Sequence, residues 1–278
     1  MHELPLVFFT VLGQMGAGAV FISALYSLTS RVQNTVKIER INIAALVVMA
    51  VAMGIASLHL GHPLRALNVI FGIGRSPMSN EIFTFGILFG ITFVSVLLAY
   101  FTQPNKGSKL ALVKTLANRI NTIPRINTII ALLLIIVSLF FVWTIVATYM
   151  IPTVQNWDTG YTALQMYTAM LILGGILAAT FGLRRAGLAL FIIGALIVLA
   201  TKLPYIRFLS QHTLELVQAQ YYWWLLQCGL LILSVFIALR NSRKSCRSTP
   251  VYAIALLLAL VAELCGRIAF YNLWAIPM

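Results

Sequence analysis

The sequence predicts an all-α fold, a polytopic bundle of eight transmembrane helices that forms one integral membrane domain over residues 1–278. Hydrophobic residues make up 61% of the sequence and charged residues only 9%, and the mean hydropathy is +0.97. A soluble domain has about a quarter charged residues, so this composition is typical of a protein embedded in lipid. We expect helices because a helix satisfies its own backbone hydrogen bonds in hydrocarbon.

Eight apolar runs are each long enough to cross about 30 Å of hydrocarbon as a helix. In sequence order they cover residues 5–28, 41–60, 82–101, 126–150, 162–183, 186–203, 221–239 and 251–273. The first run has no Lys or Arg before it and no small-residue cleavage site, so we expect it to remain in the protein. Small residues at Gly13 and Gly16, and the pair Gly86 and Gly90, predict close approach of helices.

Lys and Arg are concentrated in alternate loops. The first, third, fifth and seventh loops hold fourteen of the nineteen basic residues, whereas Arg65, Arg75, Lys202 and Arg207 fall on the opposite side. Cytoplasmic loops carry such an excess, so both termini are expected outside the cytoplasmic membrane, in the periplasm. The net charge of +13 then reflects a basic cytoplasmic rim, and nucleic-acid binding is not indicated.

Most other ionisable residues fall on the predicted outer side. These are His2, His59, His62, His212, Glu3, Glu81, Asp158 and Glu215. The segment 57–68 brings His59, His62 and Arg65 to the membrane edge shortly before Glu81. Because ionisable groups in this setting are a functional hypothesis by default, we expect any proton chemistry at the outer end.

Each candidate also has a structural interpretation. Glu81 at a helix start would gain about 0.3 to 1 kcal/mol from the helix dipole, His59 would be satisfied by a backbone carbonyl, and Arg65 would pair with lipid phosphate. The residue pattern leaves these alternatives open.

Two further polar features lie within the predicted spans. Glu263 and Arg267, four residues apart in the eighth run, are expected to form a structural ion pair on one helix face. Gln14, in the first run, either reaches the outer cavity or makes a polar contact between helices.

Cofactor motifs are missing from the sequence. Cys228, Cys246 and Cys265 have no C-x-x-C spacing, so we expect no iron-sulphur cluster and no c-type haem in this protein. No Walker motif is present, and Gly72 and Gly74 follow no predicted strand. A membrane anchor that binds haem b, as in a quinol dehydrogenase, is an alternative to a protein without cofactors. However, no His lies deep in a predicted span. A secondary transporter would need inverted repeats or broken helices, and we find neither.

Five short segments follow one another in an ordered pattern: HELPL at 2–6, FTVLGQ at 9–14, LHLGHPLRALN at 58–68, SNEI at 79–82 and ELCGRIAFY at 263–271. Together they resemble the membrane anchor subunit of bacterial dimethyl sulfoxide reductase. The likeness covers the first hundred residues and the last apolar run. It also agrees with the outer placement of the ionisable residues, which comes from loop charges alone.

The resemblance implies an anchor of a heterotrimer in the bacterial inner membrane. Its partners would be an iron-sulphur subunit and a molybdopterin catalytic subunit on the outer face. The anchor would take menaquinol as its substrate during anaerobic respiration and would hold no haem, iron-sulphur cluster or molybdenum, as the quinol-oxidising subunit of an oxidoreductase.

The resemblance also favours particular roles at a quinol site. His59 would accept a proton from one quinol hydroxyl, and Glu81 would be the second acceptor or the proton exit. Arg65 would hold a carboxylate or stabilise the anionic intermediate, and Gln14 would line the site.

Overall fold

In a computed structural model, the structure describes residues 4–30, 35–58, 63–102, 111–211, 213–243 and 248–274. The helices are α1 (Leu4–Thr29), α2 (Thr35–Leu58), η1 (Pro63–Gly72, a 3-10 helix), α3 (Pro77–Phe101), α4 (Ala111–Asn121), α5 (Ile126–Tyr149), α6 (Gly160–Thr180), α7 (Arg184–Ser210), α8 (Leu214–Ser242) and α9 (Thr249–Tyr271). The described residues contain no strand. All the α-helices except α4 are long and apolar enough to cross a membrane, which confirms the prediction of eight spans.

Several helices extend beyond the predicted apolar runs. α3 begins at Pro77, where the Ser76 side chain accepts a hydrogen bond from the Ser79 backbone N–H, and α7 continues to Ser210. Polar residues in these added turns lower the local hydropathy without stopping the helix. Lys202, which lies within the predicted run 186–203, is inside α7 and buried, and Arg207, beyond the end of that run, is also part of α7.

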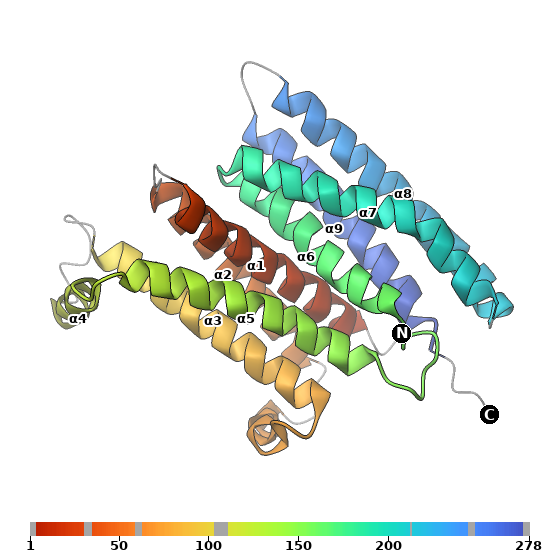
Figure 1. Cartoon of the computed structure of the whole chain (residues 1–278), viewed down its shortest axis with the longest axis horizontal. Helices are drawn as coiled ribbons and strands as arrows, with labels where there is room; N and C mark the ends of the chain where they lie inside the picture. Colours follow the sequence, from red (N-terminus) through yellow and green to blue (C-terminus); the bar gives the residue numbers. More distant parts are fainter. Residues whose placement is uncertain are drawn as a thin grey trace.

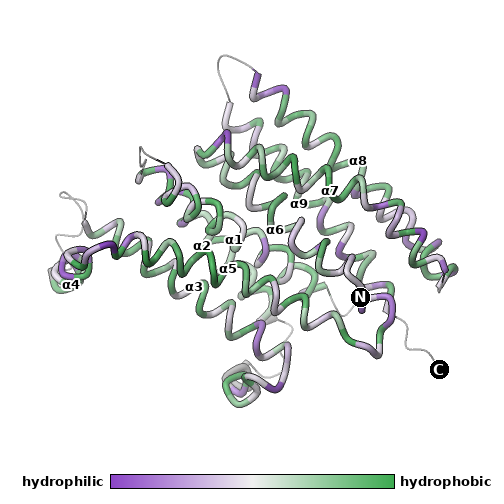
Figure 2. Tube along the Cα trace, viewed as in Figure 1, coloured by the Kyte–Doolittle hydropathy of each residue, from purple (hydrophilic) through white to green (hydrophobic). Residues whose placement is uncertain are grey.

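The helices form an antiparallel bundle in which α1 is central (Figure 1). The start of α1 and the end of α9 lie at one end with η1, and we call this the terminal end. The short helix α4 lies at the other end, which we call the α4 end. Hydrophobic residues cover the long sides of the bundle, and hydrophilic residues gather towards its ends and connections (Figure 2).

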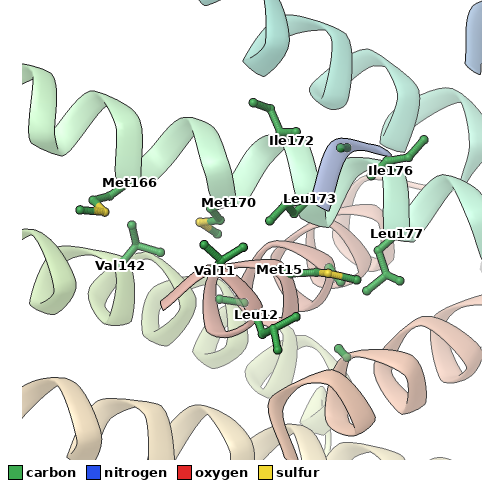
Figure 3. Packing of buried hydrophobic residues seen from close by; sticks show 14 of the residues in the cluster. Val11, Leu12, Met15, Val142, Met166, Met170, Ile172, Leu173, Ile176 and Leu177 are labelled. Atoms are coloured by element: carbon green, nitrogen blue, oxygen red, sulfur yellow. The ribbon is translucent and has the colours of Figure 1, made fainter. Parts of the chain in front are cut away.

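Helix α1 holds the two halves of the bundle together. It contacts α2 and α5 on one side and α6 and α9 on the other. Val11, Met15 and their neighbours on α1 interlock with Met170 and Leu173 of α6 (Figure 3). A Cβ atom at Gly18 would collide with the Met170 carbonyl oxygen, and one at Gly174 would collide with the Gly18 backbone. The absence of side chains at these two glycines therefore permits the close contact between α1 and α6.

The glycine predictions are confirmed in part. A Cβ atom at Gly16 would meet the Met49 side chain of α2, so this glycine does lie at a helix contact. Gly86 and Gly90 were expected at a helix contact, but a Cβ atom at either position would meet no atom within 4 Å among the described residues. That expectation was wrong, because a G-x-x-x-G spacing does not reveal which face of a helix is covered.

The substitution Gly174→Ala tests the contact between α1 and α6. The added methyl group overlaps the α1 backbone, so we expect it to lower the free energy of unfolding by about 1 to 3 kcal/mol. The measurement is thermal denaturation of the purified protein in detergent. Gly86→Ala is the matched control and should leave the transition unchanged; equal transitions for the two variants would contradict the assigned packing.

Candidate functional site

Glu81 lies in the second turn of α3 at the terminal end of the bundle. The helix begins at Pro77, so Glu81 is not the helix-opening residue that the sequence predicted. Its side chain is only 4% exposed and hydrogen-bonds with the hydroxyl of Thr148 on α5. A carboxyl group buried this deeply requires polar partners, and the interior of the bundle supplies them.

Two tyrosine hydroxyls lie beside this carboxyl group. Tyr149, the last residue of α5, hydrogen-bonds through its hydroxyl to that of Tyr271, the last residue of α9. Tyr271 also interacts with Thr10 of α1, whose hydroxyl donates to the Leu6 and Val7 carbonyl oxygens. Both tyrosines interact electrostatically with Glu81. The ends of α5 and α9 thus meet through hydroxyl groups next to Glu81, close to the second turn of α1.

An aromatic cluster supports these tyrosines at the terminal end. Trp157, in the connection between α5 and α6, donates its indole N–H to the Phe270 carbonyl oxygen at 2.8 Å. Its ring stacks on the Phe270 ring with centroids 5.3 Å apart, and it meets the Tyr149 ring edge to face at 5.6 Å. This packing fixes the orientation of the tyrosine pair.

Arg267 occupies the centre of the polar cluster. It is 5% exposed and donates to Gln14 Oε1 at 2.7 Å and to the Met166 sulphur. Gln14 in turn donates to the same sulphur at 3.3 Å. α1, α6 and α9 are therefore joined through one guanidinium group. Of the two roles that the sequence allowed for Gln14, its described contacts correspond to the polar contact between helices.

The predicted pair of Glu263 and Arg267 is more complex than a direct ion pair. The hydrogen bonds of Arg267 go to Gln14 and Met166, while the Glu263 carboxyl group hydrogen-bonds to Gln227 of α8. Both Lys202 and Arg267 act electrostatically on Glu263. Direct pairing between Glu263 and Arg267 stays a prediction.

Lys202 and Gln227 extend the cluster to α7 and α8. The Lys202 ammonium group donates to Gln227 Oε1 at 2.7 Å. Glu263 Oε1 is buried without a hydrogen-bond partner among the described residues, and it borders a cavity of about 10 Å³. Such a cavity has room for about one water molecule. Two cationic residues and two carboxyl groups are thus buried together, counting Glu81.

A larger cavity of about 440 Å³ lies between the start of α3, the segment before it, and α5. Asn80, Thr84 and Thr144 line it together with apolar residues that include Trp143 and Ala147. Glu81 does not line the cavity, but Thr84 is one turn further along α3, and its hydroxyl lies 3.0 Å from that of Thr144. The half-exposed rings of Phe140 and Trp143 place the opening on the lipid-facing side.

The structure tests only part of the predicted site. His59 and His62 lie outside the described residues, as do His2, Glu3 and His212. Arg65 belongs to η1, whose backbone is described, whereas its side chain is not. The pairing of His59 with Glu81, and the roles of Arg65 and Gln14 towards a quinol, stay predictions.

The tyrosine pair and Lys202 were missed at the sequence level. The signals were present: Tyr149 and Tyr271 each lie near the end of an apolar run, and Lys202 interrupts one. Nothing in the spacing along the sequence indicates that residues 122 positions apart share a hydrogen bond.

These features define a helical membrane protein with several candidate spans and a buried polar cluster at one end of the bundle. The chain belongs to the family of dimethyl sulfoxide reductase anchor subunits (DmsC), whose model matches residues 1–273. This match confirms the resemblance seen in the short segments.

Curated relatives agree with this assignment. The anaerobic dimethyl sulfoxide reductase protein YnfH of Escherichia coli K12 is 33% identical over 183 residues, which cover 64% of the present sequence and 57% of that relative. The C subunit of the E. coli anaerobic dimethyl sulfoxide reductase is 29% identical over 295 residues, covering 98% of the present sequence and 95% of the relative. The corresponding C subunit from Haemophilus influenzae is 26% identical with the same coverage.

Gln14→Leu tests the role of Gln14 in holding Arg267. Removing the acceptor leaves a permanently charged guanidinium group buried without its oxygen partner, so we expect a loss of about 1 to 3 kcal/mol in stability. Gln14→Glu supplies a carboxylate at the same place and should preserve stability. The measurement is the thermal transition of both variants in detergent, and equal destabilisation by the two substitutions would contradict this role.

Proposed function

We propose that this protein anchors a dimethyl sulfoxide reductase-like complex and oxidises menaquinol for it at the terminal end of the bundle. Membership of the anchor family supports the first part, together with relatives named as parts of anaerobic dimethyl sulfoxide reductases. The observation that carries the second part is a buried carboxyl group, Glu81, one turn of α3 away from Thr84, which lines a cavity beside the lipid and pairs there with the Thr144 hydroxyl.

The cavity suits the ring of a quinol. Its volume of about 440 Å³ falls within the range of small-molecule sites, and a lipid-facing opening allows entry of a substrate dissolved in the bilayer. Apolar residues form most of the wall, while Asn80, Thr84 and Thr144 provide polar atoms. A quinol has an apolar ring system and two hydroxyl groups, which this lining complements.

Oxidation of a quinol to a quinone releases two electrons and two protons. A proton acceptor must be within hydrogen-bond reach, directly or through one intermediate group. His59 is proposed to take the proton of one hydroxyl and Glu81 the proton of the other. Arg65 is proposed to stabilise the anionic intermediate, as the family resemblance implies.

Thr148 makes Glu81 suited to proton exchange. Its hydroxyl also donates to the Thr144 carbonyl oxygen at 2.9 Å. A hydroxyl has one proton and two lone pairs, so Thr148 can accept from a protonated Glu81 while it donates to Thr144. It can donate to an ionised Glu81 by rotating its proton away from the Thr144 carbonyl oxygen. Glu81 therefore retains a hydrogen-bond partner before and after it takes a proton.

The electrons are proposed to pass to an iron-sulphur subunit at the terminal end, and from there to a molybdopterin catalytic subunit. In this scheme the anchor itself holds no redox cofactor. Placing the cavity near the partner surface shortens the path of electron transfer.

The terminal end is proposed to face the periplasm, so that both termini lie outside. The concentration of Lys and Arg in loops at the opposite end supports this orientation. We expect a cysteine introduced at either terminus to react with a membrane-impermeant thiol reagent in intact cells. Reaction only after the cells are broken would show that the termini face the cytoplasm and would contradict the proposed orientation.

Glu81→Gln is the direct test of the proton acceptor. Glutamine keeps a hydrogen bond to Thr148 but cannot take up a proton, so quinol-dependent reduction of the terminal acceptor should fall roughly 100- to 10,000-fold. We expect the same direction for His59→Asn. The measurement is turnover of the assembled complex with a menaquinol analogue, compared with a soluble donor that reduces the partner directly and should still be used.

Two comparisons sharpen this experiment. Glu215→Gln removes an exposed carboxylate at the same end, on the first turn of α8, and should leave turnover unchanged. Ala147→Trp fills part of the cavity and keeps the Glu81 carboxyl group, so it should raise the KM for quinol. Normal quinol turnover in Glu81→Gln would exclude Glu81 as the acceptor, and an unchanged KM in Ala147→Trp would exclude the cavity.

A further inference from the structure

A second large opening lies at the α4 end of the bundle, away from Glu81. It is a groove of about 1070 Å³ between α2 on one side and α6, α9 and the start of α7 on the other. Met15 of α1 lies in its floor. The groove exists because α1 packs against both α2 and α6, and separates them.

Three cationic residues line this groove at its α4 end. Lys37 and Arg40 lie near the start of α2, and Arg184 is the first residue of α7. Among the described residues lining the groove there is no Asp or Glu. The nearby Glu39 lines a different cavity, between α2 and the helices α3 to α5. The lining of the groove is therefore positively charged at this end.

Local packing holds two of these cations in place. Gly182 has a φ of +126°, which favours glycine, and a Cβ atom there would lie 3.0 Å from Lys37 Cγ. The stem of Lys37 thus rests against the turn between α6 and α7. The Arg184 guanidinium group lies over the Tyr252 ring of α9, 5.8 Å from its centroid.

The wall beyond the cations is apolar. Ile43 and Val47 follow Arg40 along α2 and are 41% and 58% exposed, and Leu177 and Leu256 face them from α6 and α9. At 1.5 Å per residue, Val47 lies about 10 Å deeper along the helix than Arg40. The cations are consequently at the level of a headgroup and the apolar wall at the level of acyl groups.

We propose that this groove is a binding site for an anionic glycerophospholipid such as phosphatidylglycerol. The phosphate would lie against Lys37, Arg40 and Arg184, and an acyl tail would run along α2 over Met15. Basic pockets between transmembrane helices recognise anionic headgroups in this way. The lipid would fill the space between α2 and α6 that no side chain occupies, and so connect the two halves of the bundle.

The test uses the purified complex in detergent, stripped of lipid and titrated with phosphatidylglycerol or with phosphatidylethanolamine. Native mass spectrometry counts the bound lipids, and thermal denaturation measures stabilisation. We expect phosphatidylglycerol to be preferred and to raise the transition temperature. In the triple variant K37Q/R40Q/R184Q, the preference should fall roughly fivefold for each cation removed.

The control variant R119Q/R240Q/R243Q loses the same net charge from exposed positions outside the groove and should keep the preference. Val47→Trp fills the groove while retaining its cations, and should reduce binding of both lipids. Equal binding of the two lipids by the native protein, or equal losses in the groove and control variants, would overturn the proposal. So would displacement of phosphatidylglycerol by equimolar inorganic phosphate, which would indicate a simple anion site.

Discussion

Burial of the Arg267 guanidinium group is the constraint on which the terminal end of the bundle depends. A charge taken out of water in a membrane bundle must be compensated by polar partners and opposite charge. Here Gln14 and Met166 accept its hydrogen bonds, and the carboxyl groups of Glu81 and Glu263 interact with it electrostatically. These partners come from α1, α3, α6 and α9, so meeting the requirements of one side chain brings four helices together.

The cluster also joins helix ends at the place where the proposed chemistry occurs. The tyrosine pair ties the end of α5 to that of α9, and Trp157 closes over it through its bond to the Phe270 carbonyl. Preorganised polar groups lose little free energy to rearrangement when a charge develops beside them. The proposed lipid groove, in contrast, lies between α2 and α6, which α1 holds apart, and its wall leaves room for a flexible acyl tail.

The match between prediction and structure differs between helices and site. Long apolar runs predicted all eight spans, because the cost of unsatisfied backbone groups in lipid leaves few alternatives to a helix. Helix ends were less predictable: the predicted run ends at residue 203, whereas α7 continues to Ser210. Lys202, inside this helix, is compensated by Gln227 and Glu263 of other helices. The amphipathic α4 was not predicted, since it is short and lies outside the apolar runs. Glu81 was recognised as a candidate, whereas its partners Thr148 and Tyr149 were not.

The sequence by itself determined the class of protein, the number of spans and the family, and it identified Glu81 as a candidate site residue. It could do so because composition, hydropathy and short motifs are local properties of the polypeptide. Only the tertiary structure decided that Arg267 bonds to Gln14, that Tyr149 meets Tyr271, and that Gly86 lies against open space. Helices of similar hydropathy can pack in many arrangements, and their order in the sequence does not specify which faces meet. That choice is made by close contact at small residues and by the compensation of buried charge, and both depend on groups far apart in the sequence.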